Sequence, residues 1–333
     1  MSALRTVVGS GTTALAAALF AARRGAVDLY ARSRTPRSRS VESLPAAALT
    51  LLVELGITPD ELDVEGLSRK RIVAWQNCEP EVLDGPACAH IDTAALHHAL
   101  LGRAANNPAV TFKAGLDPSS LRPGWVDATG RRAVSARRHI RPPRTWTAAL
   151  VTVPADDTGE LRLAAAHDGY AYRLGSADWT SIGWVSPDRP PLTGGQLRAY
   201  IEKRGAAWLL GGVHIPDGID TYRRPASAAV PQPSTAAIPV GDAALARDAL
   251  ASQGVSIGLS DACLVADPAT TVDGMTRRRN DAILRHFRHL RQMATTCRYA
   301  DSRCWAEYLA WVTQASTGWS SERTTALARH GAH

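Results

Sequence analysis

The sequence predicts an α/β fold in which a parallel sheet is joined to a mostly antiparallel sheet and closed by helices. Three observations predict it. Residues 5–30 contain a short apolar strand, a glycine turn, an Ala-rich helix and a second strand, a βαβ unit whose strands must run parallel. Residues 140–235 hold many prolines and short alternating segments, which are typical of antiparallel strands. Residues 256–266 and 275–312 have helical character.

Composition excludes several classes of protein. With 333 residues, 45% hydrophobic and 21% charged, the chain is long and apolar enough for a full core. The net charge is +7, but the arginines are scattered without interleaved aromatic residues, so we expect no nucleic-acid partner. Five cysteines without a CxxC pair indicate neither disulfides nor a zinc site and favour the cytoplasm. The uncharged run at 6–22 contains two glycines and favours a buried strand and helix over a leader, and no other stretch could span a membrane.

The glycine turn carries the first functional motif. The run GSGTTA at residues 9–14 follows a strand and opens a helix, as the GxGxxG/A fingerprint of dinucleotide-binding folds requires. Gly9 makes the turn, Gly11 lets a pyrophosphate approach, and Ala14 allows close packing, while the first N–H groups at Thr12 and Thr13 attract the anion. The motif does not distinguish FAD from NAD, and a glycine turn that binds nothing is the alternative.

One partner of this fingerprint is missing. An acidic residue is expected about 20 residues further on, where it would bind a ribose hydroxyl, and Ala31 stands there. Asp28 cannot replace it because strand alternation sends its side chain to the opposite face. Arg32 or Glu42 could contact the adenosine end instead. Loss of one charge-assisted hydrogen bond costs about 1.5–3 kcal/mol, so we expect weakened cofactor binding.

A second motif lies far along the chain. The run VGDAA at residues 240–244 follows an expected strand, and Gln253, Gly254 and Val255 begin a helix after an intervening loop. Asp242 at a strand end can accept hydrogen bonds from sugar-like hydroxyls, and the helix N-terminus presents N–H groups to an anion or an electron-rich ring edge. Together the two motifs resemble those of the flavoprotein monooxygenases, which implies that Asp242 binds the ribityl chain of FAD.

Three further segments narrow the resemblance to the halogenase-like branch. The run ESLP at 42–45, the run DATGR at 127–131 and the C-terminal stretch from 298 to 311 are similar to segments of that branch, and most of all to the LodB/QhpG-like tryptophan-modifying flavoproteins. Val41, Ala249 and Thr93 depart from the usual residues of this subgroup.

The resemblance implies an activity. FAD would be reduced and would react with O2 to a flavin C4a-hydroperoxide that hydroxylates an electron-rich aromatic substrate, such as a tryptophan side chain in a peptide. The implied partners are an aromatic small molecule or an acidic peptide, together with a separate flavin reductase, because the chain has no second nucleotide fingerprint. No side chain is recognisable as the catalytic base.

Two other functions stay open. A flavin-dependent halogenase needs a lysine, for which Lys70 is a candidate, but the GWxWxIP signature of tryptophan halogenases is absent. Ala31 and Ala249 also fit a non-catalytic scaffold that has weakened FAD binding.

The inserted segment supplies the candidate substrate pocket. Trp179, Trp184 and Trp208 could line it, although the core of the inserted sheet is the more ordinary place for these tryptophans. We therefore expect a Rossmann-like FAD-binding domain at 1–140 and 236–275, a substrate-binding sheet at 141–235, and C-terminal helices with a polar tail at 276–333.

Overall fold

The structure is a computed structural model that describes residues 6–31, 39–64, 66–115, 121, 123–155, 160–187, 191–226, 230–233, 237–251 and 253–330. The strands are β1 (Thr6–Val8), β2 (Val27–Tyr30), β3 (Val41–Pro45), β4 (Ser68–Ala74), β5 (Glu81–Asp92), β6 (Val110–Lys113), β7 (Trp125–Asp127), β8 (Ala136–Ile140), β9 (Thr147–Pro154), β10 (Leu161–Ala166), β11 (Gly169–Gly175), β12 (Trp179–Ser186), β13 (Tyr222–Pro225), β14 (Val230–Pro233) and β15 (Ala237–Pro239). The helices are α1 (Thr12–Ala22), α2 (Ala46–Glu54), α3 (Thr93–Ala105), α4 (Gly194–Lys203), α5 (Gly254–Ala266), α6 (Val272–Thr296) and α7 (Arg303–His330).

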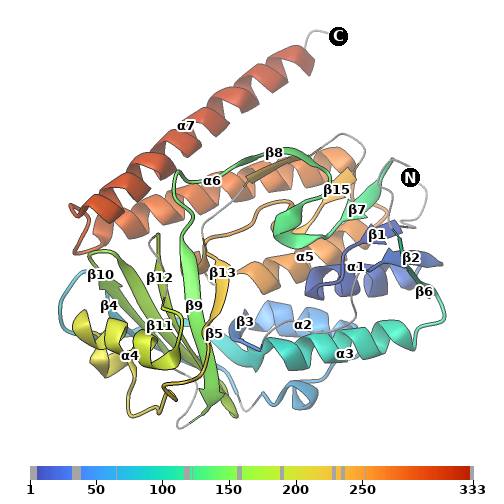
Figure 1. Ribbon diagram of the computed structural model, residues 1–333. Coiled ribbons are helices and arrows are strands. Elements are labelled where there is room, and N and C mark those ends of the chain that lie inside the picture. The colour runs from blue at the N-terminus through green and yellow to red at the C-terminus, as the bar shows by residue number, and fades with distance from the viewer. Residues whose placement is uncertain are drawn as a thin grey trace.

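The first sheet, sheet A, has the strand order β15-β7-β1-β2-β6, and all its pairings are parallel. Val7 at its centre pairs with Leu29 on one side and Val126 on the other. Helix α1 is buried from Ala14 to Ala21, because its small side chains allow it to lie close to both sheet A and α5. Figure 1 shows α1, α3 and α5 grouped beside these strands. The predicted βαβ unit and the α/β class are confirmed.

The second sheet, sheet B, has eight strands in the order β13-β9-β12-β11-β10-β4-β5-β3. All its pairings are antiparallel except that of β4 with β10. Sheet B extends beyond the expected residues 141–235, because β3, β4 and β5 come from residues 41–92. The polar pattern of these strands hides them: β4 reads SRKRIVA, and Lys70 and Arg69 occupy exposed positions. The mostly antiparallel character of the layer is confirmed.

Helices cover both faces of sheet B. On one face, Ile182 and Trp184 of β12 pack against Leu197 of α4. On the other face, Tyr170 and Val185 contact the hydrophobic cluster of α6 and α7. Alternate residues of one strand therefore belong to two different cores, as the two-residue period of a strand requires.

The C-terminal region consists of two long helices, α6 and α7, joined by a short turn. The sequence predicted one helical stretch and a polar tail, but α7 continues to His330 and extends away from the sheets (Figure 1). Among the described helices, none has both the length and the apolar composition needed to cross a bilayer.

Candidate functional site

The two glycines of the first motif have different structural roles. Gly9 has φ +144°, its N–H donates to the Tyr30 carbonyl at 2.9 Å, and a Cβ there would overlap the Ala128 carbonyl oxygen. Gly11 is the N-cap of α1, with extended backbone, and a Cβ there would have no neighbour within 4 Å. No side chain caps the helix at Gly11. The positive end of α1 therefore opens onto free space that suits an anion.

The second motif forms a tight turn after β15. Gly241 has φ +56°, and its N–H donates to Asp261 Oδ2 at 3.1 Å. Asp261 lies on α5 and is only 8% exposed. Burial raises the pKa of the Asp261 carboxyl, against the opposing effects of the Gly241 N–H and Arg278. The turn that presents Asp242 is thus fixed from behind by a buried carboxyl.

The two motifs meet in space. Thr13, in the first turn of α1, lies between Gly241 and Gly258 of α5: a Cβ on Gly241 would come within 2.9 Å of Thr13 Oγ1, and one on Gly258 would overlap it. Both glycines are therefore needed for α1, α5 and the Gly241 turn to approach each other. The side chain of Thr13 serves this packing, and the part of Thr13 in cofactor binding stays a prediction.

Asp242 lies beside the N-terminus of α5. Its Oδ2 is 3.8 Å from Arg131 Nε, and its Oδ1 is 3.9 Å from the position of a Cβ on Gly254. The Asp242 side chain is 36% exposed, so a ligand can reach it. Helix α5 begins at Gly254 after the N-cap Gln253, and no side chain caps it. The predicted residues Asp242, Gln253, Gly254 and Val255 are therefore brought together.

The loop that follows Asp242 is held by the C-terminal helices. Asp248 is 2% exposed, its N–H donates to His286 Nε2 at 3.2 Å, and its Oδ2 accepts from Tyr308 Oη at 2.7 Å. Burial lowers the pKa of His286 to about 3, with Arg247 nearby adding to the effect, so the imidazole is neutral and its Nε2 is an acceptor. Burial and the Asp248 carboxylate raise the pKa of the Tyr308 hydroxyl.

Sequence reasoning missed these residues as parts of the site. The sequence does contain a signal for His286: its spacing from Ile283 and Leu290 places this polar residue on the buried apolar face of α6. A similar signal marks Asp261, a single carboxylate within the apolar run GVSIGLSDACLVA. A polar residue on a buried helix face needs a buried partner, although the sequence does not say which one. Arg131 was recognised only as part of the DATGR run.

The two residues proposed for the adenosine end are not equally placed. Arg32 lies outside the described residues. Glu42 lies on β3, the edge strand of sheet B, where it pairs with Ile91. Strand β3 also packs against α5. The contact of Glu42 with the adenosine end of the cofactor stays a prediction. Ala31 follows β2 and packs against the core of sheet A, with its N–H 3.4 Å from the Lys113 carbonyl.

The predicted substrate residues are spread over sheet B. Trp184 is fully buried, and Trp208 packs against the same cluster beside α4. Trp179 begins β12 with the Arg39 guanidinium 3.9 Å above its ring. Their part in a substrate pocket stays a prediction. Lys70 lies on β4, where it forms an ion pair with Glu160 and keeps half of its side chain exposed.

Comparison with known proteins identifies the fold. No family model and no curated sequence matches the chain. Solved structures do: the myxobacterial chondrochloren halogenase CndH has a TM-score of 0.75 at 18% identity, covering 92% of this chain and 85% of that one. The fold is that of the FAD-dependent halogenases and monooxygenases.

Two other solved structures share the fold. The peptidyl tryptophan dihydroxylase QhpG has a TM-score of 0.69 at 20% identity and covers 92% of this chain and 79% of that one. HpxO from Klebsiella pneumoniae, solved with FAD and uric acid, has a TM-score of 0.61 at 16% identity. The match covers 96% of this chain and 92% of that one. These likenesses support the predicted architecture, which includes the C-terminal helices.

Proposed function

We propose that the chain binds FAD and is an oxidoreductase, a monooxygenase that hydroxylates an electron-rich aromatic substrate. The observation that carries this proposal is that two helices with uncapped N-termini approach each other at the Gly241 turn: Thr13 of α1 contacts Gly241 and Gly258 of α5, and Asp242 lies beside Gly254, the first residue of α5. Such a set fits a ligand with a dianionic centre, a hydroxylated chain and an electron-rich ring edge.

The residues present fit FAD part by part. The open space beside Gly11 would admit the pyrophosphate, with the N–H groups of Thr12 and Thr13 as donors. Asp242 would accept from the ribityl hydroxyls, and the first N–H groups of α5, at Gly254 and Val255, would donate to the edge of the flavin ring. FAD, when reduced, would supply the reaction with O2.

The protein contributes position and exclusion of water. Arg131 Nη2 donates to the Arg247 carbonyl at 2.7 Å, which ties the turn after β7 to the loop that follows Asp242. Asp248, His286 and Tyr308 anchor the far end of the same loop in a buried network. A loop fixed at both ends keeps Asp242 and Gly254 in place without reorganisation when the cofactor binds.

For the substrate we favour a tryptophan side chain in an acidic peptide over a free aromatic molecule. The net charge of +7 favours an acidic partner. The fold is shared with a dihydroxylase of peptidyl tryptophan. Electrons would come from a separate flavin reductase, since the chain has one nucleotide fingerprint only, at residues 9–14.

The product mass tests this function. Purified protein is given chemically reduced FAD, O2 and a tryptophan-containing acidic peptide, with Gly11→Val protein as the matched control. We expect a gain of about 16 or 32 mass units, one or two oxygen atoms, with the parent protein only. Bound flavin without any oxygenated aromatic product would contradict the monooxygenase assignment.

Halogenation is the second candidate, favoured by the fold likeness to the chondrochloren halogenase. It predicts a product whose formation requires halide and disappears in Lys70→Ala. Because Lys70 already forms an ion pair with Glu160, we rank this function second.

A further inference from the structure

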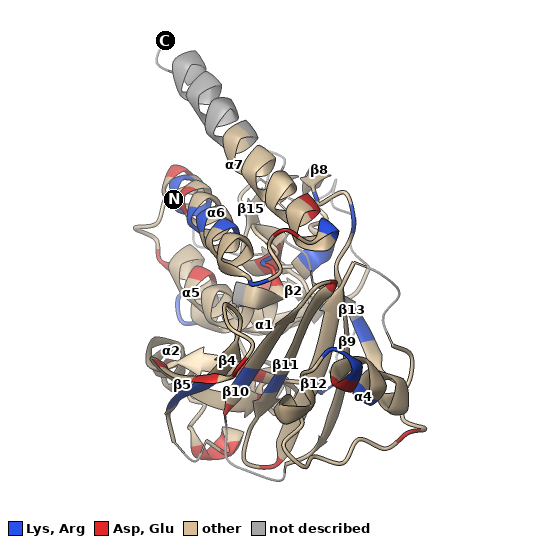
Figure 2. Cartoon of the chain, turned by 90° about the vertical axis from the view of Figure 1, so that its left-hand side faces the viewer, with Lys and Arg blue, Asp and Glu red and all other residues tan. Residues whose placement is uncertain are grey.

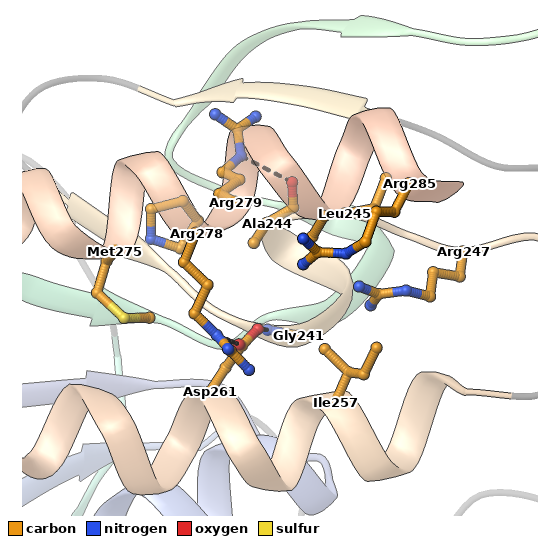
Figure 3. Close-up of a pocket in the computed structure, with 12 residues that line it drawn as sticks. Gly241, Ala244, Leu245, Arg247, Ile257, Asp261, Met275, Arg278, Arg279 and Arg285 are labelled. Carbon is orange, nitrogen blue, oxygen red and sulfur yellow. Dashed lines mark hydrogen bonds and ion pairs between the residues drawn. The ribbon is translucent and has the colours of Figure 1, made fainter. Parts of the chain in front are cut away.

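An arginine-rich pocket lies between the Gly241 turn, α5 and α6 (Figure 3). Its cavity volume is about 50 Å³, and the pocket is partly open to solvent. Neither Gly11, Asp242 nor Gly254 lines it, so it is separate from the proposed flavin site. The residues that carry its charge are Arg247, Arg278, Arg279, Arg285 and Asp261.

Two of the four arginines have their charge or hydrogen bonds satisfied within the protein. Arg278 Nε lies 3.2 Å from Asp261 Oδ1, and that carboxylate is the only acidic group lining the pocket among the described residues. Arg279 donates from Nε to the Ala244 carbonyl at 2.9 Å and from Nη2 to the Pro231 carbonyl. Burial lowers the pKa of Arg279 to about 10, and it stays charged at neutral pH.

The other two arginines have no such partner. Within the described part of the chain, neither the Arg247 nor the Arg285 guanidinium donates a hydrogen bond or forms an ion pair. Arg247 is only 7% exposed. In Figure 3 both side chains point into the space between α5 and α6. Figure 2 shows further basic residues along α6.

A largely buried guanidinium such as that of Arg247 is costly without a partner, and the like charge of the exposed Arg285 beside it adds to the cost. Burial lowers the pKa of Arg247, and the nearby Arg278 and Arg285 lower it further, while Asp261 and Asp242 oppose them. One anion between Arg247 and Arg285 would remove both penalties. A guanidinium has five N–H donors in a planar fork, which matches the paired oxygens of an oxyanion better than a spherical halide.

We propose that this pocket is a binding site for a phosphate group, held between Arg247 and Arg285 with Arg278 at its edge. Phosphate fits better than a carboxylate because its second charge balances the second unpaired arginine. The site is formed partly by the Gly241 turn, so its ligand would also stabilise that turn. The proposal does not depend on FAD.

Calorimetric titration of the full chain with inorganic phosphate tests the site. Arg247→Gln and Arg285→Gln each remove one positive charge from the pocket. Arg291→Gln serves as the control. It removes one positive charge from an exposed position on α6, the helix of Arg285, and Arg291 does not line the pocket. We expect the phosphate dissociation constant to rise about 10-fold or more in the first two variants and to stay within about twofold in the control.

Equal phosphate affinity in all four proteins, or no measurable binding by the parent, would overturn the proposal. Competition by chloride at equal concentration would overturn it too, because it would indicate non-specific attraction to the positive surface. Arg285 is exposed on α6, so Arg285→Gln keeps the test valid if Arg247→Gln fails to fold. Glycerol phosphate distinguishes the sources of the phosphate: tighter binding than inorganic phosphate indicates an organic ligand, and weaker binding the free ion.

Discussion

The two regions that form the candidate flavin site are held in different ways. The turn at residues 9–11 is fixed by its own glycines and by neighbouring strands of sheet A, through the Tyr30 and Ala128 carbonyls. The loop at residues 241–250 depends on Asp261, His286 and Tyr308, which come from three later helices. The first region is specified locally, whereas the second is specified by packing between distant segments.

This difference explains how mutations should act. In the first region, binding and folding can be separated, because Gly11 borders open space while Gly9 borders the backbone. In the second region, residues that never touch the cofactor would still control the position of Asp242.

Substitutions of the two glycines should give the largest effects and separate these roles. Gly11→Val adds a side chain where no protein atom lies within 4 Å, so we expect a normally folded protein that has lost flavin binding by on the order of 100-fold or more, as N–H bonds to the pyrophosphate are blocked. Gly9→Val should instead destabilise the fold, because its Cβ overlaps the Ala128 carbonyl. Thermal unfolding and flavin titration of both variants decide this. Equal flavin content in Gly11→Val and the parent would contradict the placement.

The second region predicts a pH dependence of stability. The pKa of His286 is about 3 in the folded protein, against 6.5 when exposed, so the unfolded chain binds one more proton between these values. Its contribution to stability is therefore complete above pH 6.5 and is lost as the pH falls toward 3.

His286→Gln isolates the contribution of His286 to this pH dependence, since a glutamine side chain can accept a hydrogen bond from the Asp248 N–H but cannot titrate. Between pH 7 and pH 5 the free energy of unfolding of the parent should fall by about 2 kcal/mol more than that of the variant. Urea unfolding at the two pH values measures the difference. Identical pH dependence would mean that His286 titrates normally and does not hold the loop as a neutral acceptor.

The same contrast explains what the sequence could and could not predict. The fingerprint turn was predicted residue by residue, because glycine spacing and strand context act within six residues. Asp242 and Gly254 were also predicted, from their place after a strand and before a helix. The anchors Asp261, His286 and Tyr308 were not, because a buried hydrogen bond between helices leaves no fixed spacing in the sequence. Strands β3 to β5 were missed for a related reason: their polar residues hid their place in sheet B.

A substitution at Ala31 tests the first region further, and its expected effect on FAD affinity is the smallest of these predictions. Ala31→Glu restores the acceptor that the first region lacks at the end of β2, and we expect FAD to bind more tightly by about 1–2 kcal/mol in this partly exposed position. Quenching of flavin fluorescence measures the change. No gain would show that the missing acid is not the reason for weak binding and that another group serves the ribose.

Titration of the purified protein with FAD tests the central claim most directly, with Asp242→Ala measured in parallel. We expect the parent to bind one FAD and turn yellow, and the variant to bind about 10-fold to 100-fold more weakly because a charged hydrogen-bond acceptor is lost. A colourless parent that FAD cannot titrate, or an Asp242→Ala variant with an unchanged dissociation constant, would contradict a flavin site formed where α1, α5 and the Gly241 turn meet.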